Sequence, residues 1–428
     1  MILIRKFKIL IKQYIISIIS SLSMIFGFVR EVLLARVLGI SKELDFFLLY
    51  TLMYDLLTTV ARDIPSGIQS IKVKNLYPTI FLFCLIFFIT ISTFWLIFCE
   101  IYYSNIYNFS LKVRIIAYTV ISLSTFLLCI QIHYLNHYVR QGKYFFQVCQ
   151  PLFLNIGLIF IMLLSIDNFI FSFIFYGLLI GAILNLIILH LYNKSIIFDF
   201  LSKINIFLKI KFDKKISLIL FFILVQAITS RGTTLIERNV LGSFQEGAVS
   251  IFNFASKIWG IPLNIFILAV SLPVVGLITT KLITQEYDEV LSIINKKIIN
   301  IIILTIPSFL LIYSFSDLII YYLFVGGEFS NDDVASVSEV LKILTYALFG
   351  AGISTLLVRS LWAMEKSYEV AILCTLNLML YAFISPYMVS KFNIIGMSYS
   401  NIIYFSFQGM VLYVYMLHVI RTLKKNNK

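Results

Sequence analysis

Long apolar runs separated by short polar segments follow one another along the whole chain. The run 77–99 reads YPTIFLFCLIFFITISTFWLIFC and carries no charged residue. An α-helix of about 20 residues crosses the roughly 30 Å of hydrocarbon in a bilayer. A barrel strand would alternate lipid-facing and interior positions, and these runs do not alternate. The pattern therefore predicts an all-α polytopic membrane protein.

The apolar runs predict about 12 transmembrane helices. Their expected limits are 13–38, 44–61, 77–99, 114–138, 147–165, 169–192, 216–238, 247–279, 298–323, 337–363, 370–389 and 395–420. Lysines and arginines set the orientation, because cytoplasmic loops carry an excess of them. With the N-terminus inside, 23 of these residues fall in inner segments and four in outer segments. Both termini are therefore expected in the cytoplasm.

The basic segment 193–215, NKSIIFDFLSKINIFLKIKFDKK, divides the chain almost in half. It alternates lysines with Ile, Leu and Phe, which favours an amphipathic helix on the inner leaflet, with a plain basic loop as the alternative. We predict an N-terminal six-helix lobe at 1–192, this cytoplasmic linker, and a C-terminal six-helix lobe at 216–428. LGISKE (38–43) and LGSFQE (241–246) occupy equivalent outer connections, which favours two parallel repeats.

Composition excludes several classes of function. The chain is 60% hydrophobic and 13% charged, and a soluble protein needs a more highly charged shell. The net charge of +13 is scattered between apolar runs, which argues against nucleic-acid binding. The five cysteines form no CxxC pair, and the histidines of HYLNH (133–137) lack an adjacent glutamate. We therefore expect no metal, no cofactor and no enzymatic site.

Seven basic residues lie inside the predicted spans. A buried cation costs at least about 2.5–3.5 kcal/mol, so these residues should line a hydrated cavity or pair with carboxylates. They are Arg30, Arg36, Arg231, Arg238, Lys257, Lys342 and Arg359. Lys342 and Arg359 lie near opposite ends of one span, where their side chains can reach the interfaces.

Arg30 is the deepest of the three charges in the first span. Glu31 lies about 100° round the helix from Arg30, so on a straight helix the two cannot both face one partner. Gly27, one turn earlier, permits a bend or a close helix contact. Arg36 is near enough to the outer end to reach the interface.

The second half carries a comparable set of charges. Arg231 and Arg238 are seven residues apart and share a face, with Glu237 beside them. Lys257 precedes Pro262, which should kink its span. A cavity edged by Arg30, Arg231 and Lys257 would suit a multiply charged anion, above all a phosphate or diphosphate.

Three acids are candidates for ion coupling or for salt bridges to these cations. They are Asp45, Asp55 and Glu237. Asp55, midway along the second span, is the deepest and could couple transport to protons or sodium. A salt bridge to one of the arginines is the alternative.

The stretch 27–50, GFVREVLLARVLGISKELDFFLLY, resembles the first helix and loop of the MurJ/MviN lipid II flippases. This family belongs to the multidrug/oligosaccharidyl-lipid/polysaccharide (MOP) exporter superfamily, which includes the MATE transporters. Stretches at 136–157, 249–276 and 323–334 are also similar, so the likeness spans nearly the whole chain. The resemblance implies a multi-pass protein of the bacterial cytoplasmic membrane that works in peptidoglycan biosynthesis.

The resemblance also implies roles for particular residues. Arg30, Glu31 and Arg36 fall on charged family positions in the central cavity, and Lys257 replaces a cavity arginine. Two six-helix lobes would rock around a lipid-linked saccharide by alternating access. Met24, Thr58, Ser256 and Gly260 depart from charged family positions, and two further C-terminal helices are not found before the chain ends at Lys428. These departures keep a polysaccharide repeat unit open beside lipid II.

Two other functions are weighed against a flippase. A cation-coupled drug exporter of the same superfamily would favour acids over arginines in the cavity. A membrane polysaccharide polymerase or ligase would carry a large outer loop with catalytic residues, and the longest outer connection here is short. We expect a monomeric flippase whose partners are the lipid-linked saccharide and membrane lipids, coupled to H⁺, Na⁺ or the membrane potential.

Overall fold

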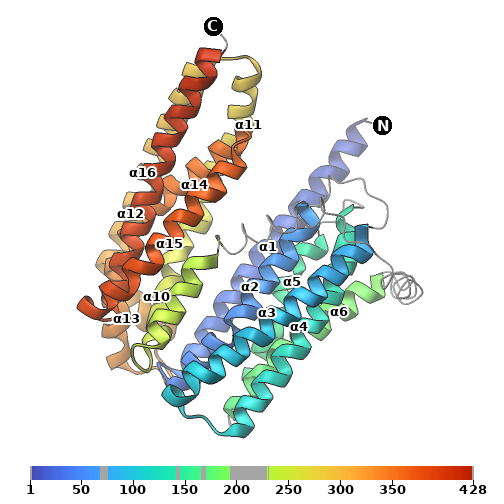
Figure 1. The fold of residues 1–428 in the computed structure, drawn as a ribbon, viewed down its shortest axis with the longest axis vertical. Coiled ribbons are helices and arrows are strands. Elements are labelled where there is room, and N and C mark those ends of the chain that lie inside the picture. The colour runs from blue at the N-terminus through green and yellow to red at the C-terminus, as the bar shows by residue number, and fades with distance from the viewer. Residues whose placement is uncertain are drawn as a thin grey trace. The chain divides into compact units, whose positions relative to one another are not determined.

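The chain forms two compact units, residues 1–228 and 229–428, in the computed structural model (Figure 1). The structure describes residues 2–67, 76–140, 145–164, 170–192, 229 and 231–426, and these are almost entirely helical. The predicted linker 193–215 lies outside the described residues, so the linker and the predicted lobe boundaries stay predictions. Each unit is described by itself.

The first unit is a bundle of long helices. In chain order these are α1 (Ile2–Leu38), α2 (Lys42–Gly67), α3 (Leu76–Tyr107), α4 (Leu111–Arg140), α5 (Phe145–Leu164), the short 3₁₀ helix η1 (Phe171–Phe173) and α6 (Ile174–Tyr192). They follow the order of the first six predicted spans. The helical fold predicted from the apolar runs is therefore confirmed.

The turn between α1 and α2 depends on a glycine and a serine. Gly39 adopts a positive φ of 61°, a conformation that glycine takes without strain, and its amide bonds to the carbonyl of Ala35 at 2.7 Å. Ser41 then accepts a 3.2 Å hydrogen bond from the amide of Leu44. The sequence LGISKE therefore ends one helix and starts the next.

Glycines let α5 and α6 pack backbone to backbone. A Cβ placed on Gly181 would lie 2.7 Å from both the Cα of Leu154 and the carbonyl oxygen of Phe153. A Cβ on Gly157 would lie 2.3 Å from the carbonyl oxygen of Gly177. Small residues at such contacts bring membrane helices within van der Waals distance of each other.

Amides join α4 to α6 inside the same bundle. Gln131 donates a 2.8 Å hydrogen bond to the carbonyl of Ala182, and Asn185 donates one of 2.8 Å to Gln131. Both amide side chains are buried. Because each is bonded, neither carries the cost of an unsatisfied polar group in an apolar interior.

The second unit begins with a helix at 231–242. It continues with α10 (Ala248–Pro262), the π-helical turn η2 (Leu263–Ile267), α11 (Leu268–Ile283), α12 (Tyr287–Phe324), α13 (Asn331–Leu344), α14 (Ala347–Ala363), α15 (Ser367–Phe392) and α16 (Ile395–Asn426). The predicted span 216–238 lies mostly outside the described residues. The span predicted at 247–279 is α10, η2 and α11, and the irregularity expected at Pro262 is the π-helical turn that follows it.

The span predicted at 337–363 is two helices, which corrects the expectation of one continuous element. α13 and α14 meet at an angle of 48°. Thr345, at the break, donates its hydroxyl to the carbonyl of Leu341 at 2.6 Å. Lys342, whose side chain was expected to reach the interface, is partly exposed and pairs with Asp317 of α12 at 2.8 Å.

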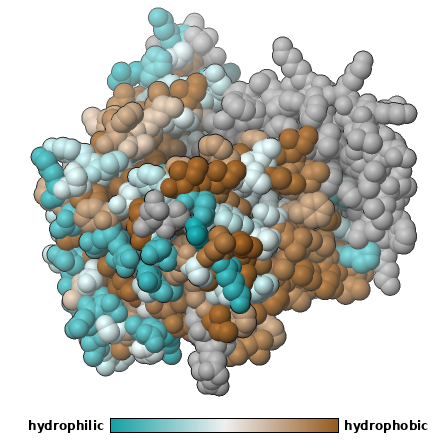
Figure 2. Space-filling model, turned by 60° about the horizontal axis from the view of Figure 1, so that its bottom comes forward, coloured by the Kyte–Doolittle hydropathy of each residue, from teal (hydrophilic) through white to brown (hydrophobic). Residues whose placement is uncertain are grey.

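Apolar side chains cover much of the surface, as the brown areas of Figure 2 show. Phe383 is 81% exposed and Tyr322 77% exposed. Among the described residues seven helices are long and apolar enough to cross a bilayer, or eight if α13 and α14 count as one span. An apolar surface of this extent indicates a protein solvated by lipid.

The glycine contacts of α6 generate a stability prediction. Gly181→Ala should destabilise the protein by about 1–3 kcal/mol, because the new methyl group would push two backbones apart. Gly276→Ala is the matched control, since nothing lies within 4 Å of a Cβ at that position. The unfolding midpoint of the purified protein in detergent should fall for the first variant only. Equal midpoints for the two variants would contradict this account of the α5–α6 contact.

Candidate functional site

The first candidate site lies where α1 packs against α5. Arg30 Nη1 donates a 2.9 Å hydrogen bond to Asn155 Oδ1, and Arg30 Nη2 forms an ion pair with Glu31 Oε1. Asn155 Nδ2 in turn donates to the carbonyl of Ser23 at 3.2 Å. Gly27 permits this close approach, because a Cβ there would lie 3.2 Å from Asn155 Nδ2. Asn155 therefore fixes the guanidinium between two helices.

Arg30 keeps hydrogen-bonding capacity for a further ligand. A guanidinium has five N–H donors, and the contacts with Asn155 and Glu31 leave several unused. Its Nε is buried and has no hydrogen-bond partner among the residues that the structure describes. The Arg30 side chain is 23% exposed, whereas that of Glu31 is 3% exposed. Arg30 is therefore the more exposed member of the pair.

The pairing of Arg30 with Glu31 was not predicted from the sequence. The two residues leave the helix about 100° apart, and the sequence argument was that they could not both face one partner along a straight helix. The arginine side chain is long enough to bend back to its neighbour, so the pair forms within one helix. Gly27 provides the close helix contact that was one of its two predicted roles, and α1 continues unbroken through it.

Arg36 and Asp45 flank the turn between α1 and α2. Arg36 is exposed in the last turn of α1, where a cation interacts favourably with the helix C-terminus. Asp45 is fully buried in the first turn of α2, where a carboxylate interacts favourably with the helix N-terminus. Both positions suit stabilisation of helix ends, and a cavity role for either residue stays a prediction.

Asp55 belongs to the electrostatic surroundings of Arg30. It is exposed on α2, and its negative charge acts on Arg30 across the first unit. Thr58 and Thr59 donate to the backbone carbonyl of Asp55, at 2.8 and 3.2 Å. These bonds involve only the backbone of Asp55, so a salt bridge to an arginine and ion coupling both stay predictions.

The second candidate site surrounds Glu237 in the second unit. Its Oε1 accepts hydrogen bonds from the Tyr381 hydroxyl of α15 at 3.1 Å and from Asn401 Nδ2 of α16 at 3.0 Å. Asn401 also lies 2.8 Å from the Tyr381 oxygen, and Tyr381 lies 3.3 Å from the sulfur of Met397. All four side chains are buried. Three helices thus meet around one carboxylate.

The cations of the second unit differ in exposure. Arg231 is exposed although it shares a helix face with Arg238, which is 8% exposed. Lys257 is partly buried in α10, one turn before Pro262. Arg30 lies in the other unit, so a cavity shared by Arg30, Arg231 and Lys257 stays a prediction.

Three site residues were missed by the sequence reasoning: Asn155, Tyr381 and Asn401. Each is a polar residue in an apolar helix that bonds directly to a predicted charge. A lone amide in an apolar run needs a partner, because an unsatisfied amide in such surroundings costs several kcal/mol. That rule could have singled out Asn155 and Asn401, although it could not have named their partners.

Comparison with known proteins gives the family. The family model described as "Lipid II flippase MurJ" matches residues 73–427. A probable lipid II flippase MurJ from Thermotoga maritima is 26% identical over 225 residues, which are 52% of this chain and 44% of that protein. One from Rhizobium tropici is 26% identical over 145 residues, 33% of this chain and 26% of that protein. These matches thus span less than half the length of either relative.

Solved structures share the fold. A lipid II flippase MurJ in an inward closed conformation superposes with a TM-score of 0.74 at 21% identity, over 95% of this chain and 87% of that one. An inward-facing MATE multidrug resistance transporter of the MOP superfamily superposes with a TM-score of 0.75 at 10% identity, over 95% and 96% of the two chains. The architecture is therefore that of MOP superfamily transporters, and by its family match the chain belongs to the lipid II flippase MurJ family.

Proposed function

We propose that the protein moves a polyprenyl-diphosphate-linked oligosaccharide from the cytoplasmic to the outer leaflet. The observation that carries this proposal is Arg30, a cation fixed by Asn155 inside an apolar helical unit, with N–H donors to spare. A guanidinium presents paired donors that match phosphate oxygens. The family match supports lipid II as the saccharide. A polysaccharide repeat unit on the same carrier would offer the same diphosphate.

Glu31 stabilises the charge of Arg30 when no substrate is bound. An unpaired guanidinium in apolar surroundings is costly, and the neighbouring carboxylate offsets its charge. A diphosphate carries more negative charge than one carboxylate, and Arg30 is the member of the pair that is partly exposed. Substrate binding would thus add to the Arg30–Glu31 pair without displacing Asn155.

Alternating access of two lobes is the proposed mechanism. The chain divides into two units with separate polar sites, one around Arg30 and one around Glu237. The similar MATE transporters are described in inward-facing and outward-facing conformations. We propose that Arg231 and Lys257 contact the diphosphate from the second lobe, and that both termini lie in the cytoplasm of a bacterial cell.

We propose Glu237 as the coupling residue. Its hydrogen-bond donors in α15 and α16, Tyr381 and Asn401, are neutral, so the carboxylate can exchange a proton or bind a sodium ion without breaking an ion pair to those helices. Binding at Glu237 would alter the junction of three helices. A change in the ion gradient would thereby bias the second lobe between two arrangements.

Depletion of the protein from cells tests the substrate directly. Polyprenyl-linked saccharide should then accumulate in the inner leaflet, because only a protein with a polar path carries a diphosphate headgroup through hydrocarbon at a useful rate. Accessibility of the glycan to an externally added enzyme measures its leaflet. If the amount of glycan accessible on the outer leaflet is unchanged in depleted cells that hold no second flippase, the proposal is rejected.

Neutralising two cations together tests the proposed phosphate contacts. Arg30→Gln combined with Lys257→Gln should slow translocation at least about tenfold, since a hydrogen bond to a charged group contributes about 1.5–3 kcal/mol. Translocation is measured in proteoliposomes, after gel filtration has shown that the variant is folded. Lys425→Gln, at an exposed position near the end of α16, is the control and should transport normally. A folded double variant with full translocation would exclude these residues as phosphate ligands.

Glu237→Gln tests the coupling proposal. The amide oxygen can still accept from Tyr381 and Asn401, so the variant should fold, but it no longer ionises. Transport should lose its acceleration by a proton or sodium gradient. The comparison is Glu246→Gln, which removes an exposed carboxylate from the turn before α10. If both variants respond to gradients as the unaltered protein does, coupling lies elsewhere.

A further inference from the structure

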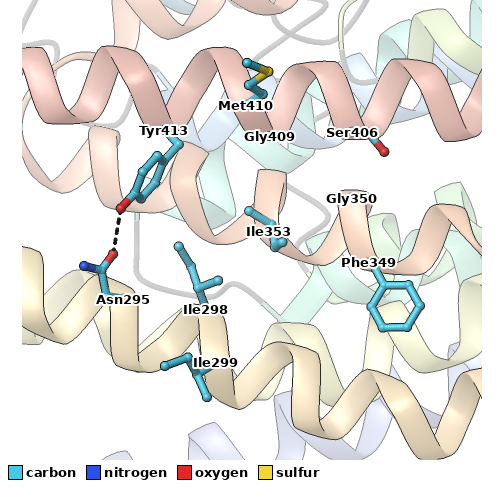
Figure 3. Close-up of a pocket in the computed structure, with 10 residues that line it drawn as sticks. All are labelled: Asn295, Ile298, Ile299, Phe349, Gly350, Ile353, Ser406, Gly409, Met410 and Tyr413. Carbon is cyan, nitrogen blue, oxygen red and sulfur yellow. Dashed lines mark hydrogen bonds between the residues drawn. The ribbon is translucent and has the colours of Figure 1, made fainter.

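A groove in the second unit lies between α12, α14 and α16. It has a volume of about 570 Å³, which is within the range of small-molecule sites. Ile299 of α12, Ile353 of α14 and Met410 of α16 are among the side chains that line it (Figure 3). Ile299 and Met410 are 56% and 68% exposed, so the groove is open on its outer side.

Glycines keep the floor of the groove free of side chains. Gly350 packs against the backbone of α16, since a Cβ there would lie 2.7 Å from the amide nitrogen of Ser406. Gly409 faces it from α16. From Ser406 to Tyr413 the groove follows α16 for seven residues, or about 10 Å. A narrow apolar channel of that length fits a hydrocarbon chain and excludes a folded partner.

One end of the groove is polar. The Tyr413 hydroxyl donates to Asn295 Oδ1 at 3.1 Å, and Figure 3 shows this pair at the end opposite Phe349 and Ser406. On α12 the residues from 298 to 316 are uncharged, whereas Lys296 and Lys297 directly precede them. The Asn295–Tyr413 pair therefore lies at the boundary between hydrocarbon and headgroups.

Two cations stand at this polar end. Lys296 precedes Ile299 by three residues and lies about 60° from it round α12. Arg421 follows Met410 by eleven residues and lies about 20° from it round α16. Both are exposed, and no hydrogen bond or ion pair of either is found in the part of the chain that the structure describes. The nearby carboxylate of Asp288 is paired with Lys424 at 2.8 Å, which leaves Lys296 and Arg421 for an anion.

We propose that this groove holds an acyl chain of an anionic phospholipid, with Lys296 and Arg421 contacting its phosphate. Side chains on a helix lean toward its N-terminus, so Arg421 leans along α16 toward the groove and Lys296 leans along α12 toward the headgroup layer. The occupant thus combines one apolar chain with a negative headgroup at the membrane boundary. The site does not depend on the transported substrate.

Native mass spectrometry of the purified full-length protein tests the proposal with dioleoyl phosphatidylglycerol and dioleoyl phosphatidylcholine. The unaltered protein should retain the anionic lipid in preference. Each cation near an anionic headgroup contributes about fivefold, so Lys296→Gln with Arg421→Gln should weaken retention about 25-fold. Lys297→Gln is the matched control, because Lys297 lies about 160° from Ile299 and points away from the groove.

A second pair of variants tests the acyl channel. Ser406→Phe should fill the far end of the groove and abolish retention of phosphatidylglycerol, whereas Ser406→Ala should leave it unchanged. Equal retention of the two lipids, or a loss of retention in Lys297→Gln as large as in the double variant Lys296→Gln with Arg421→Gln, would overturn the proposal. Retention of undecaprenyl phosphate in place of phosphatidylglycerol would also overturn it, because the groove would then belong to the substrate tail. If Ser406→Phe fails to fold, the lysine comparison still decides.

Discussion

The cost of placing a charge in hydrocarbon is the constraint on which this structure depends. Arg30 and Glu237 each lie inside a bundle of apolar helices, and each is supported by an amide from another helix. Asn155 and Asn401 play corresponding parts, since each orients a charged group through one direct hydrogen bond. In the part of the chain that the structure describes, each unit therefore holds an ionisable group in a defined position. A transporter needs such fixed groups, because a polar side chain that was free to turn toward water would not contact the substrate inside the membrane.

Glycine determines where such amides can reach. At Gly27 the absence of a side chain lets Asn155 of α5 approach α1, and at Gly157 and Gly181 it brings α6 against α5. The backbone contact of α5 with α6 makes the platform that holds Asn155 rigid. A substitution that weakens the contact on α6 would therefore also change the position of α5, and with it the hydrogen bond between Asn155 and Arg30. In the first unit, stability and the candidate site depend on the same interface.

The sequence predicted the parts of this structure that follow from local pattern. Apolar runs predicted the helices, and Pro262 marked the π-helical turn in its span. The break between α13 and α14 was missed, because no proline or glycine lies at residues 344–347, where one helix ends and the next begins. The Arg30–Glu31 pair was missed because helix angles describe where side chains begin and not how far they extend. Tyr381 and Asn401 could be joined to Glu237 only in three dimensions, since more than 140 residues separate them from it in sequence.

Depth separates the two phosphate-binding arrangements proposed for this chain. Lys296 lies just before the uncharged stretch of α12, and Arg421 lies just after the uncharged stretch of α16. A phosphate bound by these two residues would remain in the headgroup layer, and its lipid would stay in one leaflet. Arg30 lies eight residues, or about 12 Å, from the end of α1, in a helix where apolar residues predominate. A phosphate that reaches Arg30 has already left the headgroup layer. In these two proposals, contacts between cations and a phosphate would retain a lipid at the membrane boundary and would support translocation of the substrate in the interior. The depth of the cation in its helix decides between the two outcomes.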